Sequence, residues 1–261
     1  PIPNPQSPIP NPQSPLLLFF AINIAVILYK NIYYINFFNE IIMGNKPCII
    51  GVCGATRSGK TTLCKNIVKY LNSEEKKIIH LDNYFSLELL WEYKNNWEIP
   101  EVIDWDDLID DIEKPKYVIN YNKQKFIIVE GFLLFKEPLC YKFDKSIFIS
   151  ITKDEAKKRR METKPVPEEY YEDLVWPNYL KNNHHLAKMK MNREKMLGKD
   201  LLVLDSNTDN EEEMNKKAID FIFNKKEMKR DLIKEQELLN DIENKYKELE
   251  NKNFDKKNRQ L

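Results

Sequence analysis

The sequence predicts an α/β fold in which a parallel β-sheet of about five strands is flanked by helices. Two observations lead to this expectation. From Pro47 onward, short runs of β-branched residues alternate with segments of helical periodicity, which is the pattern of parallel strands joined by crossover helices. In addition, the run "CIIGVC" leads directly into the glycine-rich stretch "GATRSGKTT", and a helical pattern follows at once. A strand, a glycine loop and a helix in that order are typical of such a sheet.

The expected elements follow one another with short connections. Leu63, Ile67 and Leu71 recur at helical spacing, which predicts a helix directly after the glycine loop. Apolar runs predict strands at 48–53, 76–82, 125–131, 146–151 and 201–205. Helices are expected at 59–71, 103–112 and 152–163.

The chain before this pattern has a different character. The first residues, "PIPNPQSPIPNPQSP", repeat a proline-rich unit with too few apolar side chains to fold. The apolar stretch that follows is interpreted either as a signal anchor or as residues that precede a native start at Met43. The second interpretation is favoured, because a secretory fate does not suit unpaired cysteines. Residues 1–42 are therefore expected to lie outside the native domain, and residues 43–224 to form it.

The last segment, 225–261, is a highly charged helical pattern. Leu232, Leu239 and Tyr246 are spaced seven apart, with Ile242 between them. This spacing fits either a short coiled coil through which the chain self-associates or a helix that stays solvated. The sequence leaves both interpretations open.

The charge balance gives no basic field for nucleic acid. The chain of 261 residues has 41 Lys and Arg against 41 Asp and Glu, so a small molecule is the expected partner and neither nucleic acid nor a membrane is. The four cysteines form no C-x-x-C pair, and this favours buried thiols in a reducing, cytoplasmic environment. They are Cys48, Cys53, Cys64 and Cys140.

The glycine loop carries the strongest functional signal. The stretch "GATRSGKT" fits G-x-x-x-x-G-K-[ST], a loop whose backbone N–H groups surround the phosphates of a nucleotide. Lys60 is expected to reach the β- and γ-phosphates of ATP, and the Thr61 hydroxyl to ligate Mg²⁺. A glycine turn without a ligand is the disfavoured alternative. The residues expected to bind ATP are Gly54, Ala55, Thr56, Arg57, Ser58, Gly59, Lys60, Thr61 and Thr62.

Two carboxylates are expected at the same edge of the sheet as this loop. The carboxyl ends of parallel strands meet there, and Asp82 and Glu130 end the second and third expected strands. Asp82 is interpreted as a general base in preference to a helix cap. Glu130 ends an apolar strand, and Mg²⁺ is the simplest partner for its buried charge. His80 is interpreted as a core residue, whereas His184 and His185 have no informative spacing.

Further motifs narrow the class of nucleotide-binding protein. A GTPase would carry an N-K-x-D clamp, and the chain shows none that is convincing. The pattern "AKKRR" instead indicates a small lid helix, with which phosphotransferases close arginines over the transferring phosphoryl group. Arg159 and Arg160 are the candidates, and an exposed cationic helix face is the alternative.

These residues resemble the nicotinamide riboside kinases, within the uridine kinase-like P-loop nucleoside kinases. The resemblance runs from about Cys48 to about Asp209. Within it, "EGFLLF" and "VWPNYL" resemble the riboside kinases in particular, whereas a uridine kinase more typically has Asn-Phe-Asp-His-Pro where this chain has "NWEIP". The further stretches that carry it are "GATRSGKTTL", "LDNYF", "NWEIPEVIDW", "IIVEGFLLF" and "AKKRR".

The resemblance implies a P-loop NTPase-type fold and a reaction. The γ-phosphate of ATP would pass to the 5′-hydroxyl of nicotinamide riboside, giving nicotinamide mononucleotide for NAD synthesis. It implies Asp82 as the base, Lys60 and Arg159 on the phosphates, and Thr61 and Glu130 beside Mg²⁺.

It also implies a set of substrate contacts. Phe85 and Trp97 match the aromatic positions around the nicotinamide, where a pyridinium cation gains cation–π attraction that neutral uracil does not. Glu98 and Arg160 match a clamp on the ribose hydroxyls. Two positions depart from the family: Glu98 stands where aspartate is usual, and Thr163 or Lys164 stands where a further arginine is usual. The departures bear on the ribose contact and on the grip on ATP.

Two rival functions follow from the same residues. One is a uridine or cytidine kinase on the same scaffold. The other is a nucleotide-binding regulatory or scaffold protein whose working part is the C-terminal helix. Intact Lys60, Thr61, Asp82 and Glu130 argue against this last interpretation.

Overall fold

The structure is a computed structural model that describes residues 46–136, 139–186, 200–224 and 231–258. The chain divides into two units, Pro1–Lys46 and Pro47–Leu261, and every element named below belongs to the second. The expectations for residues 1–42 lie outside the described residues and stay predictions. Among the helices of the described ranges, none has both the length and the apolar character needed to cross a membrane.

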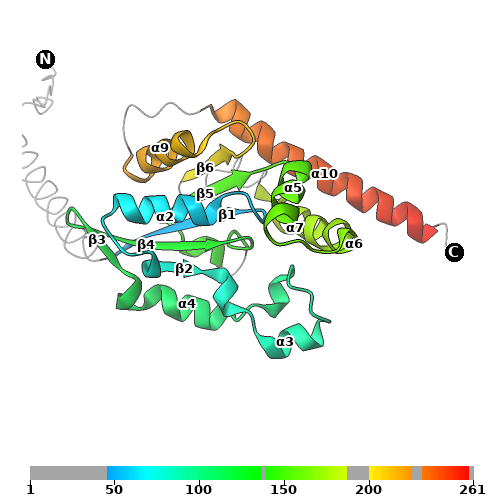
Figure 1. Ribbon diagram of the computed structural model, residues 1–261, viewed down its shortest axis with the longest axis horizontal. Coiled ribbons are helices and arrows are strands. Elements are labelled where there is room, and N and C mark those ends of the chain that lie inside the picture. Colours follow the sequence, from blue (N-terminus) through cyan, green and yellow to red (C-terminus); the bar gives the residue numbers. More distant parts are fainter. Residues whose placement is uncertain (1–45, 137–138, 187–199, 225–230, 259–261) are drawn as a thin grey trace, which may run out of the picture. The chain divides into compact units, whose positions relative to one another are not determined.

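A mostly parallel six-stranded sheet forms the centre of the second unit (Figure 1). Its strand order is β2-β4-β1-β5-β6, with all of these neighbours parallel, and β3 adds an antiparallel pairing to β4. The predicted α/β fold is therefore confirmed. The strands are β1 (Cys48–Gly54), β2 (Ile78–His80), β3 (Ile119–Tyr121), β4 (Gln124–Gly131), β5 (Lys145–Ser150) and β6 (Asp200–Asp205).

Helices connect and cover these strands, and four of them fall where the sequence predicts helix. Asp104 caps α4 by accepting a hydrogen bond from the Asp107 N–H, and Asn210 and Glu213 form a capping box at the start of α9. The α-helices are α2 (Lys60–Tyr70), α3 (Leu87–Glu92), α4 (Trp105–Glu113), α5 (Lys153–Thr163), α6 (Glu168–Tyr170), α7 (Trp176–Asn183), α9 (Glu211–Ile222) and α10 (Leu232–Asn258). A π-helix, Tyr171–Val175, joins α6 to α7.

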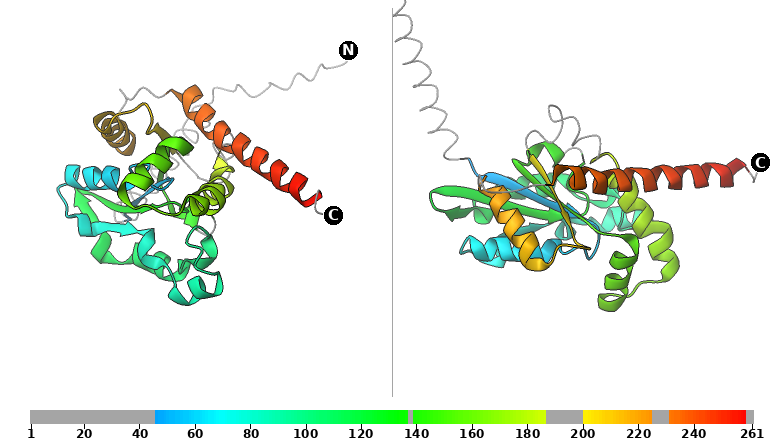
Figure 2. Two further views of the ribbon diagram at one scale, coloured as in Figure 1. Left: turned by 45° about the vertical axis from the view of Figure 1, so that its right-hand side comes forward. Right: turned by 90° about the horizontal axis from the view of Figure 1, so that it is seen from above.

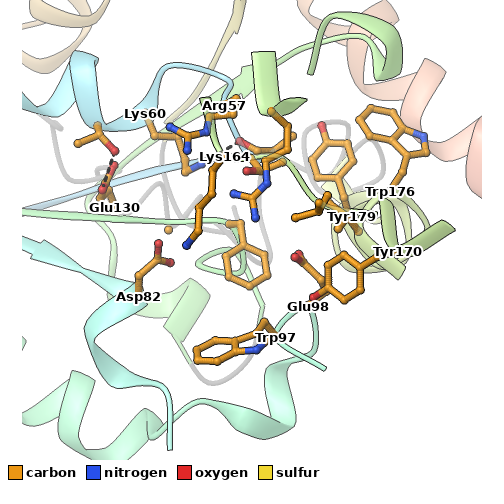
Figure 3. Close-up of a pocket in the computed structure, with 18 of the residues that line it drawn as sticks. Arg57, Lys60, Asp82, Trp97, Glu98, Glu130, Lys164, Tyr170, Trp176 and Tyr179 are labelled. Atoms are coloured by element: carbon orange, nitrogen blue, oxygen red, sulfur yellow. Dashed lines mark hydrogen bonds between the residues drawn. The ribbon is translucent and has the colours of Figure 1, made fainter. Parts of the chain in front are cut away.

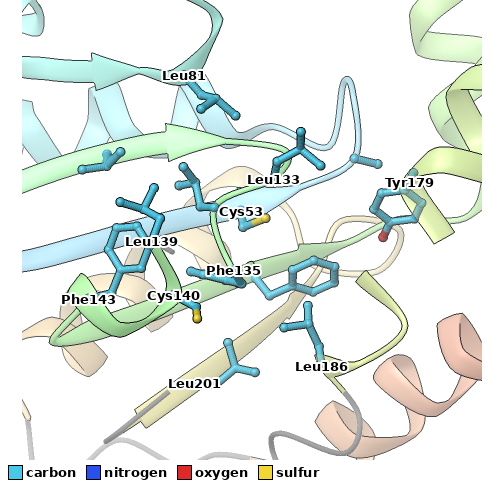
Figure 4. Packing of buried hydrophobic residues seen from close by; sticks show 14 of the residues in the cluster. Cys53, Leu81, Leu133, Phe135, Leu139, Cys140, Phe143, Tyr179, Leu186 and Leu201 are labelled. Atoms are coloured by element: carbon cyan, nitrogen blue, oxygen red, sulfur yellow. The ribbon is translucent and has the colours of Figure 1, made fainter. Parts of the chain in front are cut away.

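The alternation of side chains along β1 divides the core between the two faces of the sheet. Ile50 and Val52 pack on the face covered by α2 and α9. Ile49 and Cys53 pack on the opposite face, which α4, α7 and α10 cover. Figure 4 shows part of this second cluster, in which Cys53 lies between the sheet and the buried side chains that follow β4.

Strand β2 is shorter than the predicted strand 76–82, and the position of Asp82 depends on where the strand ends. The chain turns after His80 into a 3₁₀ segment, Leu81–Tyr84. Leu81 is fully buried against Gly131, where an added Cβ would lie only 2.5 Å from the Leu81 Cβ. This packing turns the chain out of the strand, so that Asp82 lies beyond the carboxyl end of β2.

Helix α10 packs on the sheet within the same compact unit, although the sequence analysis separates 225–261 from the domain. Leu239 and Ile242 are buried, and the Tyr246 ring stacks on His184 of α7 with 4.1 Å between ring centroids. Figure 2 shows α10 beside α7 in both views. The apolar positions that fit a coiled coil therefore pack against their own chain, because this contact removes apolar surface from water.

Candidate active site

A cavity of about 850 Å³ lies at the carboxyl edge of the sheet, beside the glycine loop (Figure 3). Most of the predicted site residues line it together, although they come from segments far apart in the sequence. They are Ala55, Thr56, Arg57, Gly59, Lys60, Thr61, Thr62, Asp82, Phe85, Trp97, Glu98, Glu130 and Arg160. Gly54, Ser58 and Arg159 are not among the residues that line it.

The glycine loop owes its path to positions that only glycine fills easily. An added Cβ on Gly54 would lie 2.5 Å from the carbonyl oxygen of Ile149, and Gly59 has a φ of 99° at the start of α2. The N-cap residue of α2 is Gly59, which has no side chain to accept a hydrogen bond from the first turn. The N–H groups of that turn are therefore available to an anion. Lys60 folds back across the loop, where its Nζ donates to the Ala55 carbonyl at 2.8 Å.

Glu130 lies beside this loop with one oxygen satisfied and one not. Its Oε1 accepts a hydrogen bond from the Thr61 hydroxyl at 2.9 Å and lies 2.6 Å from Nδ1 of His80. Its Oε2 is buried without a hydrogen-bond partner. Burial raises the pKa of Glu130, but the hydrogen bond from His80 and the charge of Lys60 outweigh it and hold that pKa below its usual value.

The oxygen atoms of Thr61 and Glu130 are suitable ligands for Mg²⁺. A hydroxyl and a buried carboxylate with an unsatisfied oxygen are the hard oxygen ligands that this ion prefers. Within the described residues, no three His, Cys, Asp or Glu side chains gather as a metal cluster. Thr61 and Glu130 would therefore share the ion with water and with nucleotide phosphates, as is usual for Mg²⁺ beside ATP.

The interpretation of His80 as a core residue needs correction. Its side chain is half-buried and pairs with Glu130, and this hydrogen bond raises the pKa of the imidazole. The register of β2 against β4 places His80 directly opposite Glu130. Recognising that these two strands are neighbours would have revealed the pair.

Asp82 faces the cavity from the 3₁₀ segment that follows β2 (Figure 3). Two contacts hold this segment in place. The Tyr84 hydroxyl donates to Asp111 of α4 at 2.6 Å, and the Asp104 N–H donates to the Tyr84 carbonyl at 2.8 Å. The cap of the following helix, α3, is Ser86. The alternative role of Asp82 as the cap of that helix is thus taken by another residue.

Phe85, Trp97 and Phe132 form an aromatic cluster in the cavity wall. Phe85 and Trp97 meet edge to face with 4.9 Å between ring centroids, and Phe132 lies roughly parallel to Phe85 at 6.4 Å. A third ring stacked between two others needs a separation of roughly 7 Å. Phe85 and Trp97 therefore leave no open slot between them as they stand. The Trp97 side chain is 42% exposed, so solvent rather than protein borders its outer side.

Glu98 and Arg160 lie near one another in the cavity with incomplete hydrogen bonding. Burial raises the pKa of Glu98 to about 7, with the nearby charge of Arg160 opposing the rise and that of Asp82 adding to it. The Nε of Arg160 is buried and lacks a hydrogen-bond partner. The Glu98 carbonyl is held by the Asn182 side chain at 3.3 Å. Two charged groups are thus fixed here without full compensation from the protein.

Comparison with known proteins identifies relatives among kinases. Residues 50–176 match the family model described as AAA domain. Nicotinamide riboside kinase 1 of Homo sapiens is 32% identical over 154 residues, which cover 52% of this chain and 76% of that protein. The chain belongs to the nicotinamide riboside kinase family, among the uridine kinase-like P-loop kinases.

Two further relatives place this family membership in context. Nicotinamide riboside kinase 1 of Mus musculus is 27% identical over 162 residues, covering 55% of this chain and 82% of that protein. A uridine kinase of Bacillus cytotoxicus is 31% identical over 142 residues, covering 45% of this chain and 67% of that protein. As a member of this group of kinases, the protein is a phosphotransferase of the nucleoside and nucleotide kinase class.

Arg159, expected from the resemblance to close on the phosphates of ATP, lies beside the glycine loop but does not line the first cavity. Its guanidinium donates to Ser206 through Nη1 at 2.8 Å and Nη2 at 3.0 Å, and its Nε donates to Glu155 at 2.7 Å. It borders a second cavity of about 300 Å³. Adjacent residues on an α-helix point about 100° apart, and here Arg160 lines the first cavity while Arg159 borders the second.

One wall of the site is not evident from the sequence. Tyr170, Val175, Trp176 and Tyr179 line the cavity, and the π-helix starts directly after the first of them and ends at the second. A π turn bonds residues five apart, so it brings Tyr170 and Val175 to the same side of the helix. The phrase "VWPNYL", which marks the riboside kinase family, contains three of these residues, but its sequence alone does not indicate their position. Lys164 also extends into the cavity (Figure 3).

Proposed function

We propose that this kinase transfers the γ-phosphate of ATP to the 5′-hydroxyl of nicotinamide riboside. The observation that carries the proposal is the meeting, in one cavity, of the glycine loop, Asp82 and the aromatic cluster of Phe85, Trp97 and Phe132. The loop binds the phosphates of the donor ATP, the carboxylate provides a base, and the aromatic rings form the surface that attracts a pyridinium cation. The names of the riboside kinase relatives support the same substrate.

ATP would lie across the glycine loop. The two cavities share Gly59 and Thr62, so a nucleotide whose phosphates meet Lys60 can extend its base into the second cavity. Arg159 and Met214 border that second cavity. In this arrangement Arg159 binds the donor nucleotide, and Arg160 faces the acceptor.

The acceptor would lie with its ribose toward Glu98 and Arg160. The carboxylate accepts hydrogen bonds from the sugar hydroxyls, and the buried guanidinium donates to them. This places the 5′-carbon toward Asp82, which takes the hydroxyl proton as the oxygen attacks the γ-phosphorus. The bond from that phosphorus to the β-bridging oxygen breaks, and ADP leaves.

The remaining groups stabilise charge during transfer. Mg²⁺ bound beside Thr61 and Glu130 would neutralise charge on the phosphate oxygens. Lys60 then needs only to exchange the Ala55 carbonyl for a phosphate oxygen, a short movement from its present hydrogen bond. Lys164 brings a further positive charge to the cavity.

A uridine or cytidine kinase is the second candidate, because a uridine kinase relative reaches 31% identity. A panel of nicotinamide riboside, uridine and cytidine assayed with Mg-ATP separates the two. We expect the highest kcat/KM with nicotinamide riboside. Equal or better use of uridine would promote the second candidate, and no nucleoside-dependent consumption of ATP would favour a regulatory role. We place the reaction in the cytoplasm, since the four cysteines form no C-x-x-C pair.

A further inference from the structure

The loop that follows β6, residues 205–209, is the segment that holds Arg159. Ser206 accepts from this arginine through both its hydroxyl and its carbonyl oxygen, at 2.8 and 3.0 Å. The Ser206 N–H in turn donates to the Ser150 carbonyl at the end of β5. Arg159 also donates to the Arg57 carbonyl in the glycine loop at 3.4 Å. The position of the guanidinium beside the second cavity thus depends on the conformation of this loop.

Asp205 is the centre of the loop. Its Oδ1 accepts from the N–H and the side chain of Asn207 at 3.0 and 2.8 Å, and its Oδ2 accepts from the Thr208 hydroxyl at 2.8 Å. The Asp205 side chain is only 8% exposed. A buried charge of this kind is stable in the loop only while its hydrogen-bond donors stay in place.

The remaining contact comes from α10. The Nζ of Lys234 lies 3.1 Å from Oδ2 of Asp205 and donates to the Thr208 hydroxyl at 2.8 Å. Lys234 therefore bridges the same two side chains that close the loop. Among the described residues of α10, Lys234 is the one that contacts both Asp205 and Thr208.

Helix α10 is fixed firmly enough to make this bridge specific. Glu235, the next residue, is 5% exposed, and its Oε2 accepts from the Val203 N–H of β6 at 3.1 Å. Further along, Leu239 is buried and Tyr246 stacks on His184. These contacts hold the start of α10 beside the end of β6, which keeps Lys234 within reach of Asp205.

We propose that Lys234 is a positioning residue for the ATP site. It acts through Asp205 and Thr208 on the loop, through Ser206 on Arg159, and thereby on the second cavity, where the donor nucleotide lies under the proposed function on which this inference rests. The C-terminal helix then contributes to the donor site, although no residue of α10 is among those that border either cavity.

The test compares Lys234→Ala with a matched control. Lys245→Ala removes a lysine of the same helix that pairs with Asp241, one turn away on α10, and not with the loop. Binding of Mg-ATP is measured by titration calorimetry, and the KM values for ATP and for the nucleoside by steady-state kinetics. We expect Lys234→Ala to raise the Kd and the KM for ATP about three- to fivefold, the range of a partly exposed ion pair. The nucleoside KM and kcat of Lys234→Ala should stay within about twofold of the wild-type values. Lys245→Ala should leave the Kd and KM for ATP unchanged, together with the nucleoside KM and kcat.

Two further variants separate positioning from a general loss of structure. Lys234→Arg keeps the charge and should restore the Kd for ATP to within about twofold of the wild-type value. In an Arg159→Ala background, Lys234→Ala should add no further loss, because the residue through which it acts is gone. Equal losses in both KM values, or a full additional loss in that background, would overturn the inference.

The outcome also separates this inference from the proposed function. If the wild-type protein binds no ATP, the proposed function fails. If it binds ATP and Lys234→Ala binds it equally well, only the role of Lys234 fails.

Discussion

On the donor side of the site the cationic side chains of Lys60 and Arg159 are hydrogen-bonded to the protein, whereas on the acceptor side a buried nitrogen of Arg160 is not. Lys60 donates to the Ala55 carbonyl, and Arg159 is held by Glu155 and Ser206. Across the cavity, the buried Nε of Arg160 has no hydrogen-bond partner. The donor side is built largely from backbone groups of the glycine loop, while the acceptor side is built from long side chains.

This difference bears on where the two halves of the site obtain their selectivity. Backbone groups that already lie in position bind any nucleotide phosphate at little cost in conformational entropy. Charged side chains without full partners instead favour the ligand whose hydroxyls complete them, and they disfavour one that lacks these groups. The acceptor half is therefore where we expect substitutions to change the choice of substrate.

The largest effect is expected where the two halves meet, at Asp82. Asp82→Asn keeps the size of the side chain but removes the base, so kcat should fall by about 10² or more. Binding of ATP and of the nucleoside, measured by calorimetry, should stay nearly unchanged. A variant with unaltered kcat would show that Asp82 is not the base.

The next effect separates the two adjacent arginines, since one belongs to each half. Arg160→Ala should raise the KM for nicotinamide riboside about tenfold and weaken the preference for ribose over 2′-deoxyribose, because a charged hydrogen bond contributes about 1.5–3 kcal/mol. Arg159→Ala should raise the KM for ATP by a similar factor instead. Each variant is the control of the other, measured by steady-state kinetics with both substrates. If both variants raised the same KM, the division into halves would be wrong.

A smaller effect is expected at the aromatic edge of the acceptor half. Trp97→Ala should raise the KM for nicotinamide riboside about fivefold and that for uridine less, because a ring contact with a cation contributes about 0.5–2 kcal/mol. Trp91→Ala is the matched control, since the Trp91 side chain on α3 is 80% exposed and does not line the cavity. Equal losses with both nucleosides would show that Trp97 supports the cavity without recognising the nicotinamide.

The smallest effect concerns the stability cost of Glu98. Burial raises its pKa from 4.5 to about 7, so folding favours the protonated form, and the stability that this provides is lost as the pH rises through 7. Glu98→Gln mimics the neutral form at every pH. Its Tm should exceed that of the wild type at pH 8 by roughly 2–4 °C, which is the change for about 1 kcal/mol in a unit of this size.

The control for this comparison is the pH itself. Near pH 4.5 the wild-type side chain is itself largely protonated in the folded state, so calorimetric Tm values of the two proteins should converge there. A Tm difference that is the same at both pH values would indicate a packing effect of the amide instead.

The sequence predicts the donor half better than the acceptor half, for a physical reason. The glycine loop is a contiguous stretch whose conformation follows from local backbone requirements, such as the positive φ of Gly59. The edge where it meets Asp82 and Glu130 follows from the rule that parallel strands end together. The acceptor half joins residues of α5, the π-helix and the segment after β2, and no local pattern predicts how these approach one another.

The sequence by itself therefore determines the parallel sheet, the phosphate loop and the family to which the chain belongs, because each depends on residue types at short spacings. Only the tertiary structure decides that His80 pairs with Glu130, that Arg159 and Arg160 face different cavities, and that α10 packs on the sheet. These outcomes depend on which strands are neighbours and on the direction in which each helix turns its side chains. Both are set by the burial of apolar surface between segments that are far apart in the chain.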